Sequence, residues 1–490
     1  MTTIERIRSG LRGESFRAAL SGAFCDAYDQ YVRLWLDQEG DPGHALEVIE
    51  RGRSRALLDV LGGGSWLVEG KSGADADAAL VARRNELCGL IAASHAMLDR
   101  PLGVAPRGKP VAAAELEVQL AEVERRLAST RRYAGEFSPP PSQQHLIAAI
   151  PAWGALIEYF VELDHVSAIV ARDGTTTCHR GLCSLTQLSD GLGAIRLQLS
   201  IAMRSGMLDA AVAAPMAQEA MLHLGQLLVA PLWDRVGGAS DIAIVADGQV
   251  AAVPFQSLCI NAGWLVDLAR IVRAPSAAIM NRLSTRLQPE SARAPMVVIG
   301  LADANALRAE EESLEIARIT GAQRVLLGGE ATRQSVLRAL DGAGSVHIAS
   351  HARFVAHSPM QSAIRLADGW LTARDLYCVE LLGGCVVLSA CDTGRTGVGH
   401  GRELLGLGRA FLTAGAGSLI LSQWLLHDAA AARMVSELYN VRKLSEGPPL
   451  SGSDALRLAQ RSLRRAMPHP AAWGGWYCVG PWNQTGSLRS

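Results

Sequence analysis

Apolar residues near the start of the chain recur at helical spacing. They follow one another at steps of three and four residues, which places them on one face of a helix: Phe16, Leu20, Phe24, Tyr28, Tyr31, Leu34 and Leu36. The segment Gly40-Asp-Pro-Gly43 ends this helix, and a second apolar set runs from Ala45 to Leu61. The pattern predicts a helical hairpin over residues 1–65.

Two further helical patterns cover residues 74–98 and 112–133, where alanine is frequent and arginine and glutamate separate the apolar positions. A proline-rich loop divides them, and Ser138-Pro-Pro-Pro-Ser142 marks a boundary. We therefore expect residues 66–140 to form a helical linker. The hairpin cannot bury its apolar face alone, so it must pack on a later part of the chain or on a partner.

From about residue 145 the pattern changes to short apolar runs that alternate with helical stretches. Residues 155–161 and 166–171 predict a strand pair, with a turn at Asp173-Gly174, and residues 185–232 predict a long helical stretch. The run 241–246 predicts a buried strand. Asp247-Gly248 is typical of a hairpin turn, with a returning strand over residues 250–255.

The second half of the chain repeats this alternation. Strands are predicted at 296–300, 325–327, 345–349, 385–389 and 418–422, and helices at 307–320, 331–340, 372–377 and 402–414. Such alternation indicates an α/β fold with a parallel sheet covered by helices on both faces. We expect two parts, residues 145–290 and 291–485.

Composition adds limits to this picture. The chain has 490 residues, which suggests two to four domains, and a net charge of −1 that makes no electrostatic case for nucleic acid or an anionic membrane. Nine cysteines are scattered without a CxxC pair, and the first residues lack the apolar stretch of a secretory signal. These features predict reduced thiols and a cytoplasmic location.

The candidate chemistry lies after two of the predicted strands. His351 follows the strand at 345–349 and Cys391 follows the strand at 385–389, each among small residues. Active sites of parallel sheets gather at the carboxyl ends of strands. A cysteine nucleophile needs a base that forms the thiolate and backbone N–H groups that hold an oxyanion. The pair predicts a cysteine peptidase, with Cys391 and Ala352 as N–H donors.

Other interpretations of these residues stay open. Cys391 could be a buried structural thiol, as Cys378 and Cys385 are expected to be, and an isolated histidine is most often a core or surface group. His347 and His351 share a strand face, but no further ligand has a spacing suited to zinc. The sequence predicts no metal and no organic cofactor.

A further segment, Ser422-Gln-Trp-Leu-Leu-His-Asp428, comes after the next predicted strand and should lie along the same edge. Asp428 is a candidate anionic floor for a pocket that receives arginine or lysine. It could equally cap a helix that starts at residue 429, and both roles are compatible.

Residues of about 145–483 resemble the CHAT peptidases, relatives of caspases and separases. The blocks that carry the resemblance occur in order: Val250-Ala-Ala-Val-Pro-Phe-Gln-Ser-Leu258, Ala274-Pro-Ser-Ala277, Leu326-Leu-Gly-Gly-Glu-Ala-Thr332, Val346-His-Ile-Ala-Ser-His351, Leu371-Thr-Ala-Arg-Asp-Leu376, Leu388-Ser-Ala-Cys-Asp-Thr-Gly394, Glu403-Leu-Leu-Gly-Leu-Gly-Arg-Ala-Phe411, Ala455-Leu-Arg-Leu-Ala-Gln460 and His469-Pro-Ala-Ala-Trp473. The N-terminal hairpin is similar to the last tetratricopeptide (TPR) repeat that often precedes this domain.

The resemblance implies a caspase-like α/β sandwich, with a pseudo-caspase unit followed by an active caspase-like unit. It implies His351 as general base and Cys391 as nucleophile, and a pocket for a basic P1 side chain formed by Trp424, Asp428 and Asp392. The sequence departs from the family at Ala352, where glycine is usual, and at His427, where an acid or threonine is frequent.

Three hypotheses fit these residues. The first is a cytoplasmic cysteine endopeptidase that cuts proteins after Arg or Lys, regulated in bacterial antiviral defence or cell death, with a regulatory protein partner on the N-terminal helices. The second, of a different class, is a catalytically idle TPR–CHAT interaction module. The third, acyl transfer to a small molecule, lacks any segment that resembles a nucleotide or coenzyme site.

Overall fold

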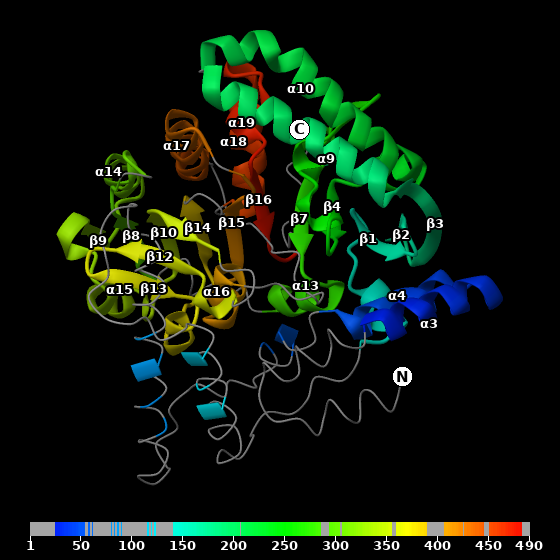
Figure 1. Cartoon of the computed structure of the whole chain (residues 1–490), viewed down its shortest axis with the longest axis horizontal. Coiled ribbons are helices and arrows are strands. Elements are labelled where there is room, and N and C mark those ends of the chain that lie inside the picture. The colour runs from blue at the N-terminus through cyan, green and yellow to red at the C-terminus, as the bar shows by residue number, and fades with distance from the viewer. Residues whose placement is uncertain are drawn as a thin grey trace.

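The computed structural model describes residues 25–53, 141–205, 207–285, 294–303, 306–354, 359–389, 406–424, 426–444 and 450–482, together with single positions between 57 and 123. Within these ranges an 11-stranded sheet crosses the molecule in the order β3-β2-β1-β4-β7-β16-β15-β14-β10-β8-β9 (Figure 1). The predicted α/β class, with a large and mostly parallel sheet preceded by helices, is confirmed.

The first half of the sheet comes from the middle of the chain: β1 (Gly154–Glu162), β2 (His165–Arg172), β3 (Thr175–Ser184), β4 (Asp241–Val245) and β7 (Arg270–Ala274). The strands β1, β2 and β3 form an antiparallel meander, and β1, β4 and β7 are parallel. All residues of β4 are buried, which explains the continuous apolar run in its sequence.

The second half is parallel throughout: β8 (Met296–Gly300), β9 (Arg324–Leu327), β10 (Ser345–Ala349), β14 (Cys385–Ser389) and β15 (Ser418–Ser422). The strand β16 (Trp476–Val479) lies between the halves, antiparallel to β15 and parallel to β7. The two halves therefore run in opposite directions, and their carboxyl ends lie at opposite edges of the sheet.

Helices cover both faces, as predicted. On one face, at the top of Figure 1, lie α9 (Leu185–Ser205), α10 (Met207–Leu228), α14 (Ala309–Thr320), α17 (Asp428–Leu444), α18 (Gly452–Ala466) and α19 (Pro470–Trp473). The short helices α11 (Trp233–Val236) and α12 (Leu265–Leu268) pack in the same cores. On the other face lie α3 (Cys25–Gln38), α4 (Pro42–Gly52), α8 (Gln143–Ala148), α13 (Ala277–Ser284), α15 (Arg333–Leu340) and α16 (Leu407–Thr413).

Two predicted elements are wrong. Residues 250–255 do not return as a strand, because Val250–Ala252 and Phe255–Ser257 form 3-10 turns and β7 takes the place beside β4. The predicted helix at 372–377 is a strand end followed by the 3-10 turn Asp375–Cys378. In the first case Pro254 has no N–H for a strand ladder, so the chain curls into turns.

Two small sheets were not predicted: β5 (Cys259–Ile260) with β6 (Gly263–Trp264), and β11 (Ala352–Arg353) with β12 (Ala363–Leu366) and β13 (Gly369–Thr372). The second of these matters for the site, because it begins directly after His351. The alternation in residues 363–366 and the Asp368-Gly369 pair are the signals that could have predicted the β12–β13 hairpin.

The helices α3 and α4 lie within the hairpin predicted for residues 1–65 and pack against the sheet. Residues 1–24 of that prediction, and most of 54–65, lie outside the described residues. Leu46 and Ile49 of α4 join the same core as Leu156 and Val245 of the sheet. The predicted helices at 74–98 and 112–133 lie mostly outside the described residues, but the described positions in both are helical, and Leu87 packs with Leu116.

A buried charge cluster connects the hairpin to the sheet. Arg53 donates from Nη1 to Glu158 Oε1 of β1 at 2.5 Å and from Nη2 to the carbonyl of Tyr159 at 2.5 Å, and Nη2 lies 3.1 Å from Asp247. Glu50 accepts the N–H groups of Ala277 and Ala278 at the start of α13. Burial raises the pKa of Glu158 well above its usual range; Arg53 opposes this shift, while Glu50 and Asp247 add to it.

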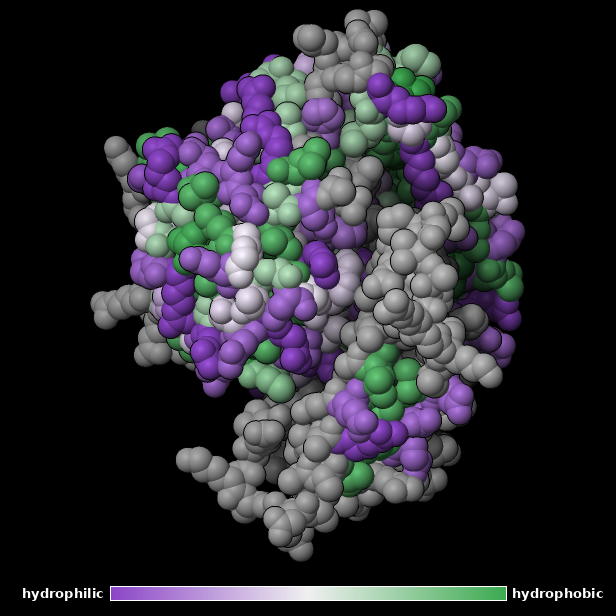
Figure 2. Space-filling view, turned by 60° about the vertical axis from the view of Figure 1, so that its left-hand side comes forward, coloured by the Kyte–Doolittle hydropathy of each residue, from purple (hydrophilic) through white to green (hydrophobic). Residues whose placement is uncertain are grey.

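The end of the sheet at β9 lies away from the N-terminal hairpin and is partly exposed. The edge strand β9 is half-exposed along its length. Figure 2 turns this side forward, and its coloured surface shows hydrophobic residues in small groups separated by hydrophilic ones. No helix in the described ranges combines the length and apolarity that a membrane crossing requires.

The Arg53→Met variant tests the charge cluster. It leaves the buried Glu158 carboxylate without its cation, so the free energy of unfolding should fall by about 3 to 5 kcal/mol, measured by urea unfolding at pH 8. Arg51→Met is the matched control, because Arg51 forms a partly exposed pair with Glu47 in the same helix, and its cost should stay below about 1 kcal/mol.

The pH dependence and a double variant complete this test. The raised pKa of Glu158 contributes stability below its ordinary value of 4.5, and this stability is lost as the pH rises through the folded-state value. The cost of Arg53→Met should therefore be smaller at pH 5 than at pH 8, and adding Glu158→Gln should restore most of the stability. Equal costs at both pH values would contradict the cluster's assigned role.

Candidate active site

The strands that precede His351 and Cys391 are direct neighbours. The parallel strands β10 and β14 pair from Val346 opposite Val386 to Ala349 opposite Ser389. Residues 351 and 391 therefore each come two positions after paired residues at the same level of the sheet. The sequence predicted adjacent strands, and this register confirms it.

Cys391 and Asp392 themselves lie outside the described residues, which end at Ser389 and resume at Gly406. The roles predicted for them stay predictions. The described part of the site consists of the His351 segment, the end of β14 and the segment that comes after β15.

The backbone on both sides of His351 is held by β12. The N–H of Arg365 donates to the His351 carbonyl at 2.8 Å, and the Ser350 hydroxyl donates to the Arg365 carbonyl at 2.7 Å. The His351 side chain is half-buried, and its Nδ1 has no hydrogen-bond partner in the part of the chain that the structure describes. His351 thus combines a fixed backbone with a buried ring nitrogen that has no hydrogen-bond partner among the described residues.

Ala352 begins β11 and pairs with Ile364 of β12. Because the Arg365 N–H bonds to the His351 carbonyl, Ala352 and Ile364 form a non-hydrogen-bonded pair, and the Ala352 N–H points away from β12. The described residues other than glycine with positive φ are Leu163 and Asp173, so Ala352 needs no glycine-only torsion. Alanine at this position therefore keeps the strand and leaves its N–H unused by the ladder.

Sequence reasoning missed the residues that surround His351 in space. Trp370 of β13 contacts the His351 ring edge-on, with 5.8 Å between ring centroids and 64° between planes. Arg353 lies over the Trp370 ring with its guanidinium carbon 4.4 Å from the centroid, and Arg365 lies at 5.6 Å.

His347 does not join His351 in a common site. It is fully buried on β10, with Nε2 lying 3.2 Å from Glu312 of α14 and its ring meeting Tyr439 of α17 edge-on. In the described ranges no three His, Cys, Asp or Glu side chains are grouped so that they could hold a metal ion.

The segment after β15 leaves the same edge as β10 and β14, because Leu388 of β14 pairs with Leu421. Its first residue, Gln423, is anchored to the other half of the molecule: Nε2 donates to the Ala252 carbonyl at 2.6 Å, and Oε1 accepts from Arg273 at 3.3 Å. The turn at 250–255, which the sequence analysis assigned to a strand, thus supports the candidate pocket segment.

Arg273 is a buried cation at this junction. Its guanidinium lies over the Tyr477 ring at 4.6 Å from the centroid and also donates to the Ala251 carbonyl. Burial lowers its pKa from the usual value, an effect that the nearby Tyr477 opposes. Carbonyl and amide oxygens and an aromatic face therefore satisfy this charge.

Trp424 packs toward β16 and the helices. A Cβ atom on Gly475 would come within 2.7 Å of Trp424 Nε1, so only glycine allows this close approach. The indole lies between the two apolar cores on the α9–α18 face. A role for Trp424 in a P1 pocket stays a prediction.

Asp428 is the first residue of α17, and the His427 carbonyl accepts the N–H groups of Ala430 and Ala431. The helix thus begins one residue earlier than the cap interpretation assumed, and Asp428 belongs to its first turn. A carboxylate there is favoured by the helix dipole. Its place in a pocket stays a prediction.

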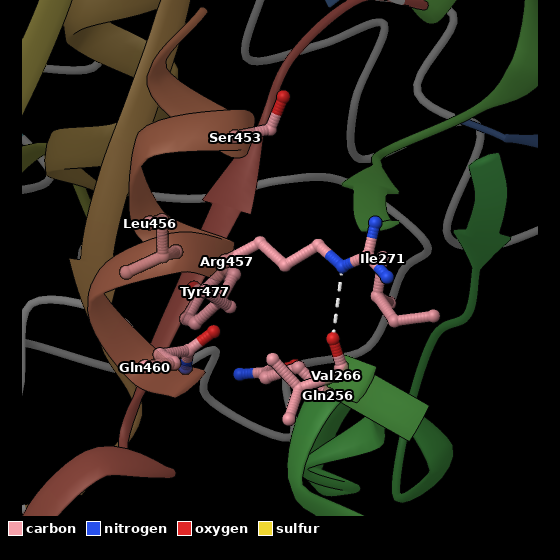
Figure 3. A pocket seen from close by; sticks show the side chains of 8 residues that line it. All are labelled: Gln256, Val266, Ile271, Ser453, Leu456, Arg457, Gln460 and Tyr477. Carbon is pink, nitrogen blue, oxygen red and sulfur yellow. Dashed lines mark hydrogen bonds between the residues drawn. The ribbon is translucent and has the colours of Figure 1, made fainter. Parts of the chain in front are cut away.

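A small cavity lies elsewhere, between the halves of the molecule. Its volume is about 10 Å³, the space of one water molecule. Its lining includes Gln256, Tyr477 and Arg457, whose Nε donates to the Val266 carbonyl at 2.9 Å (Figure 3). The cavity shares no residue with the His351 site and is too small for a peptide.

Comparison with known proteins identifies the family. The CHAT domain family matches residues 218–481, more than half of the chain, and the chain belongs to this family. The predicted family membership is confirmed.

Curated relatives are long proteins. Tetratricopeptide repeat protein 28 of Mus musculus is 25% identical over 331 residues, which cover 54% of this chain and 13% of that protein. The Homo sapiens protein is 25% identical over 323 residues, covering 52% and 13%. The chain thus spans a small part of the length of these relatives.

Similar solved structures include the separase–securin complex of Saccharomyces cerevisiae, with a TM-score of 0.46, 11% identity and coverage of 69% of this chain and 30% of that chain. The Arg-specific cysteine proteinase gingipain R has a TM-score of 0.38, 11% identity and coverage of 60% and 75%.

The Gln423→Ala variant tests the anchor of the segment after β15. It removes the bond to the Ala252 carbonyl and one acceptor of the buried Arg273, so the free energy of unfolding should fall by about 1 to 3 kcal/mol in urea unfolding. Gln226→Ala is the control, because its amide makes one exposed bond to Asn261, and it should change stability by about 0.5 kcal/mol or less. Equal effects of the two variants would contradict the anchoring role.

Proposed function

We propose that this protein is a cysteine endopeptidase in which His351 is the general base and Cys391 the nucleophile. The observation that carries the proposal is the register of β10 and β14, with Ala349 opposite Ser389. Residues 351 and 391 each follow this pair by two positions. The two strands that lead to them therefore end at the same level of the same sheet edge. Thiolate formation requires a base beside the thiol, and this strand register supports such an arrangement.

The mechanism is derived from these roles. His351 takes the proton of the Cys391 thiol, and the thiolate attacks the scissile carbonyl to form a carbon–sulfur bond. The N–H groups of Ala352 and Cys391 hold the oxyanion. Protonated His351 then donates its proton to the leaving amine as the carbon–nitrogen bond breaks, and a water activated by His351 hydrolyses the thioester.

Two polar groups beside the strand end support these assignments. Among the described residues, the Ala352 N–H is left unused by the β11–β12 ladder and the His351 Nδ1 has no hydrogen-bond partner. Neither the formation of the thioester nor its hydrolysis needs a metal ion or an organic cofactor. Family resemblance supports a regulated role in bacterial antiviral defence or cell death, in the cytoplasm, with a regulatory partner on the N-terminal helices.

For specificity we propose cleavage after Arg or Lys, with Asp428 as the anionic group of the P1 pocket and with Trp424 and Asp392 near it. The position of Asp428 in the first turn of α17, at the edge where β15 ends, supports this assignment. A carboxylate pairs with the guanidinium or ammonium group of a basic side chain.

The Cys391→Ala variant tests the nucleophile. Cleavage of fluorogenic peptides that scan the P1 residue should fall by on the order of 10³-fold or more, with unchanged circular dichroism and thermal midpoint. The expectation that Cys378 is buried is wrong, because its thiol is exposed, whereas Cys385 is buried as expected. Cys378→Ala is therefore the matched control and should keep its activity. Undiminished cleavage by the Cys391 variant would refute the dyad, and silence of the unmodified protein in every peptide would favour the interaction module.

The Asp428→Asn variant tests the pocket. It keeps the shape and removes the charge, so kcat/KM for peptides with Arg or Lys at P1 should fall by about 100-fold, while peptides with an uncharged P1 residue should lose far less. Asp375→Asn is the control, because Asp375 forms an ion pair with Arg333 and has no part in the proposed pocket. A uniform loss over all P1 residues would show that Asp428 supports the helix and not the specificity.

A further inference from the structure

The small sheet that begins directly after His351 has two different faces. Its buried face carries Ala352, Ile364, Leu366 and Leu371, which join the main core. Side chains alternate along a strand, so the other face carries His351, Arg353, Arg365 and Trp370, all of them half-buried. Arg365 lies directly opposite Trp370 in the β12–β13 pairing. We call this group the Trp370 face.

The Trp370 face holds two positive charges beside the candidate base. Both guanidinium groups lie over the same indole, at 4.4 Å for Arg353 and 5.6 Å for Arg365. A stacked guanidinium keeps its N–H groups at its edge, where they can bind a carboxylate with two parallel hydrogen bonds. Trp370 therefore positions the Arg365 guanidinium without using its N–H donors.

Arg365 has no carboxylate partner in the part of the chain that the structure describes. Its guanidinium donates at 3.3 Å to the Gly369 carbonyl, and Ser350 and His351 engage only its backbone. A half-exposed cation without an ion pair, held against an aromatic ring, is arranged to receive an anion from outside the chain.

The short distance between the Trp370 and His351 rings indicates that this anion would belong to a bound substrate. The His351 and Trp370 ring centroids are 5.8 Å apart, and an extended peptide advances about 3.3 Å per residue. A substrate whose scissile carbonyl lies beside His351 thus places the side chain of a residue within two positions of the cleaved bond over the Trp370 face.

We propose that the Trp370 face is a substrate subsite that binds an acidic side chain, Asp or Glu, within two residues of the scissile bond. This inference rests on the proposed peptidase function and extends it. The preferred substrate would combine a basic P1 residue with a nearby acidic residue. Arg365 would bind the carboxylate, and Trp370 would be a positioning residue.

The experiment uses the full chain and quenched fluorogenic peptides with Arg at P1. Glu is compared with Gln at P2, P1′ and P2′, because the two side chains have nearly the same shape and differ in charge. We expect kcat/KM to favour Glu by about tenfold at one position, with the difference mainly in KM. The preference should weaken as salt is raised from about 50 to about 500 mM, because the Debye length shortens over this range.

Variants separate a binding role from a structural one. Arg365→Gln should bring the Glu-to-Gln ratio close to one, and Arg365→Glu should reverse it, so that a peptide with Lys at that position is preferred. Arg318→Gln, which removes an exposed arginine paired with Glu315 on α14, should keep the ratio. A structural role of Arg365 would lower the rates for Glu and Gln peptides together and leave the ratio unchanged.

Two failures are distinguishable. Cleavage that depends on Cys391 but shows equal rates for Glu and Gln at every position would overturn the acidic subsite and leave the peptidase proposal standing. Absence of any cleavage that depends on Cys391 would overturn both.

Discussion

The arrangement of the whole molecule depends on where one short strand is placed. β16 joins the halves of the sheet, with four residues paired to β15 and Arg273 of β7 on its other side. Side-chain amides hold it: Gln256 and Gln460 both donate to the Trp476 carbonyl. Trp476 and the nearby Trp473 are fully buried and fill the adjoining core. Because β16 runs antiparallel to β15, the carboxyl ends of the two halves face opposite edges, and the edge with His351 belongs to the second half alone.

The first half nevertheless takes part in building that edge. Arg273 and Ala252 come from the first half, and both bond to Gln423 at the point where the chain leaves β15. Burying a cation without a carboxylate is costly unless polar atoms and aromatic faces surround it, and here carbonyls and the Tyr477 ring do so. The same principle operates at the N-terminal hairpin, where Arg53 balances the buried Glu158. The halves and the hairpin are thus joined by buried charges whose separation would expose unpaired groups.

The sequence predicted the strands with continuous apolar runs most accurately. The bounds of the strands at 345–349, 385–389 and 418–422 match the structure residue for residue, because burial on both faces demands apolar side chains at nearly every position. Short elements were predicted less well. Residues 250–255 and 372–377 contain apolar residues at spacings that suit more than one structure, and their conformation depends on the elements that pack against them. The hairpin from Ala363 to Thr372 was missed although its turn carries a recognisable Asp-Gly signal.

By itself, the sequence determined the α/β class, the candidate base and thiol, and their position at strand ends, because these depend on local apolar periodicity and on residue chemistry. The tertiary structure decided the register in which the adjacent strands β10 and β14 pair, the place of β16 between two opposed halves, and the meeting of Arg353, Arg365 and Trp370 beside His351. These contacts join residues that are far apart in the chain, and the local sequence around each residue does not specify its partner. Strand order is set by the packing of all layers together, which no local pattern encodes.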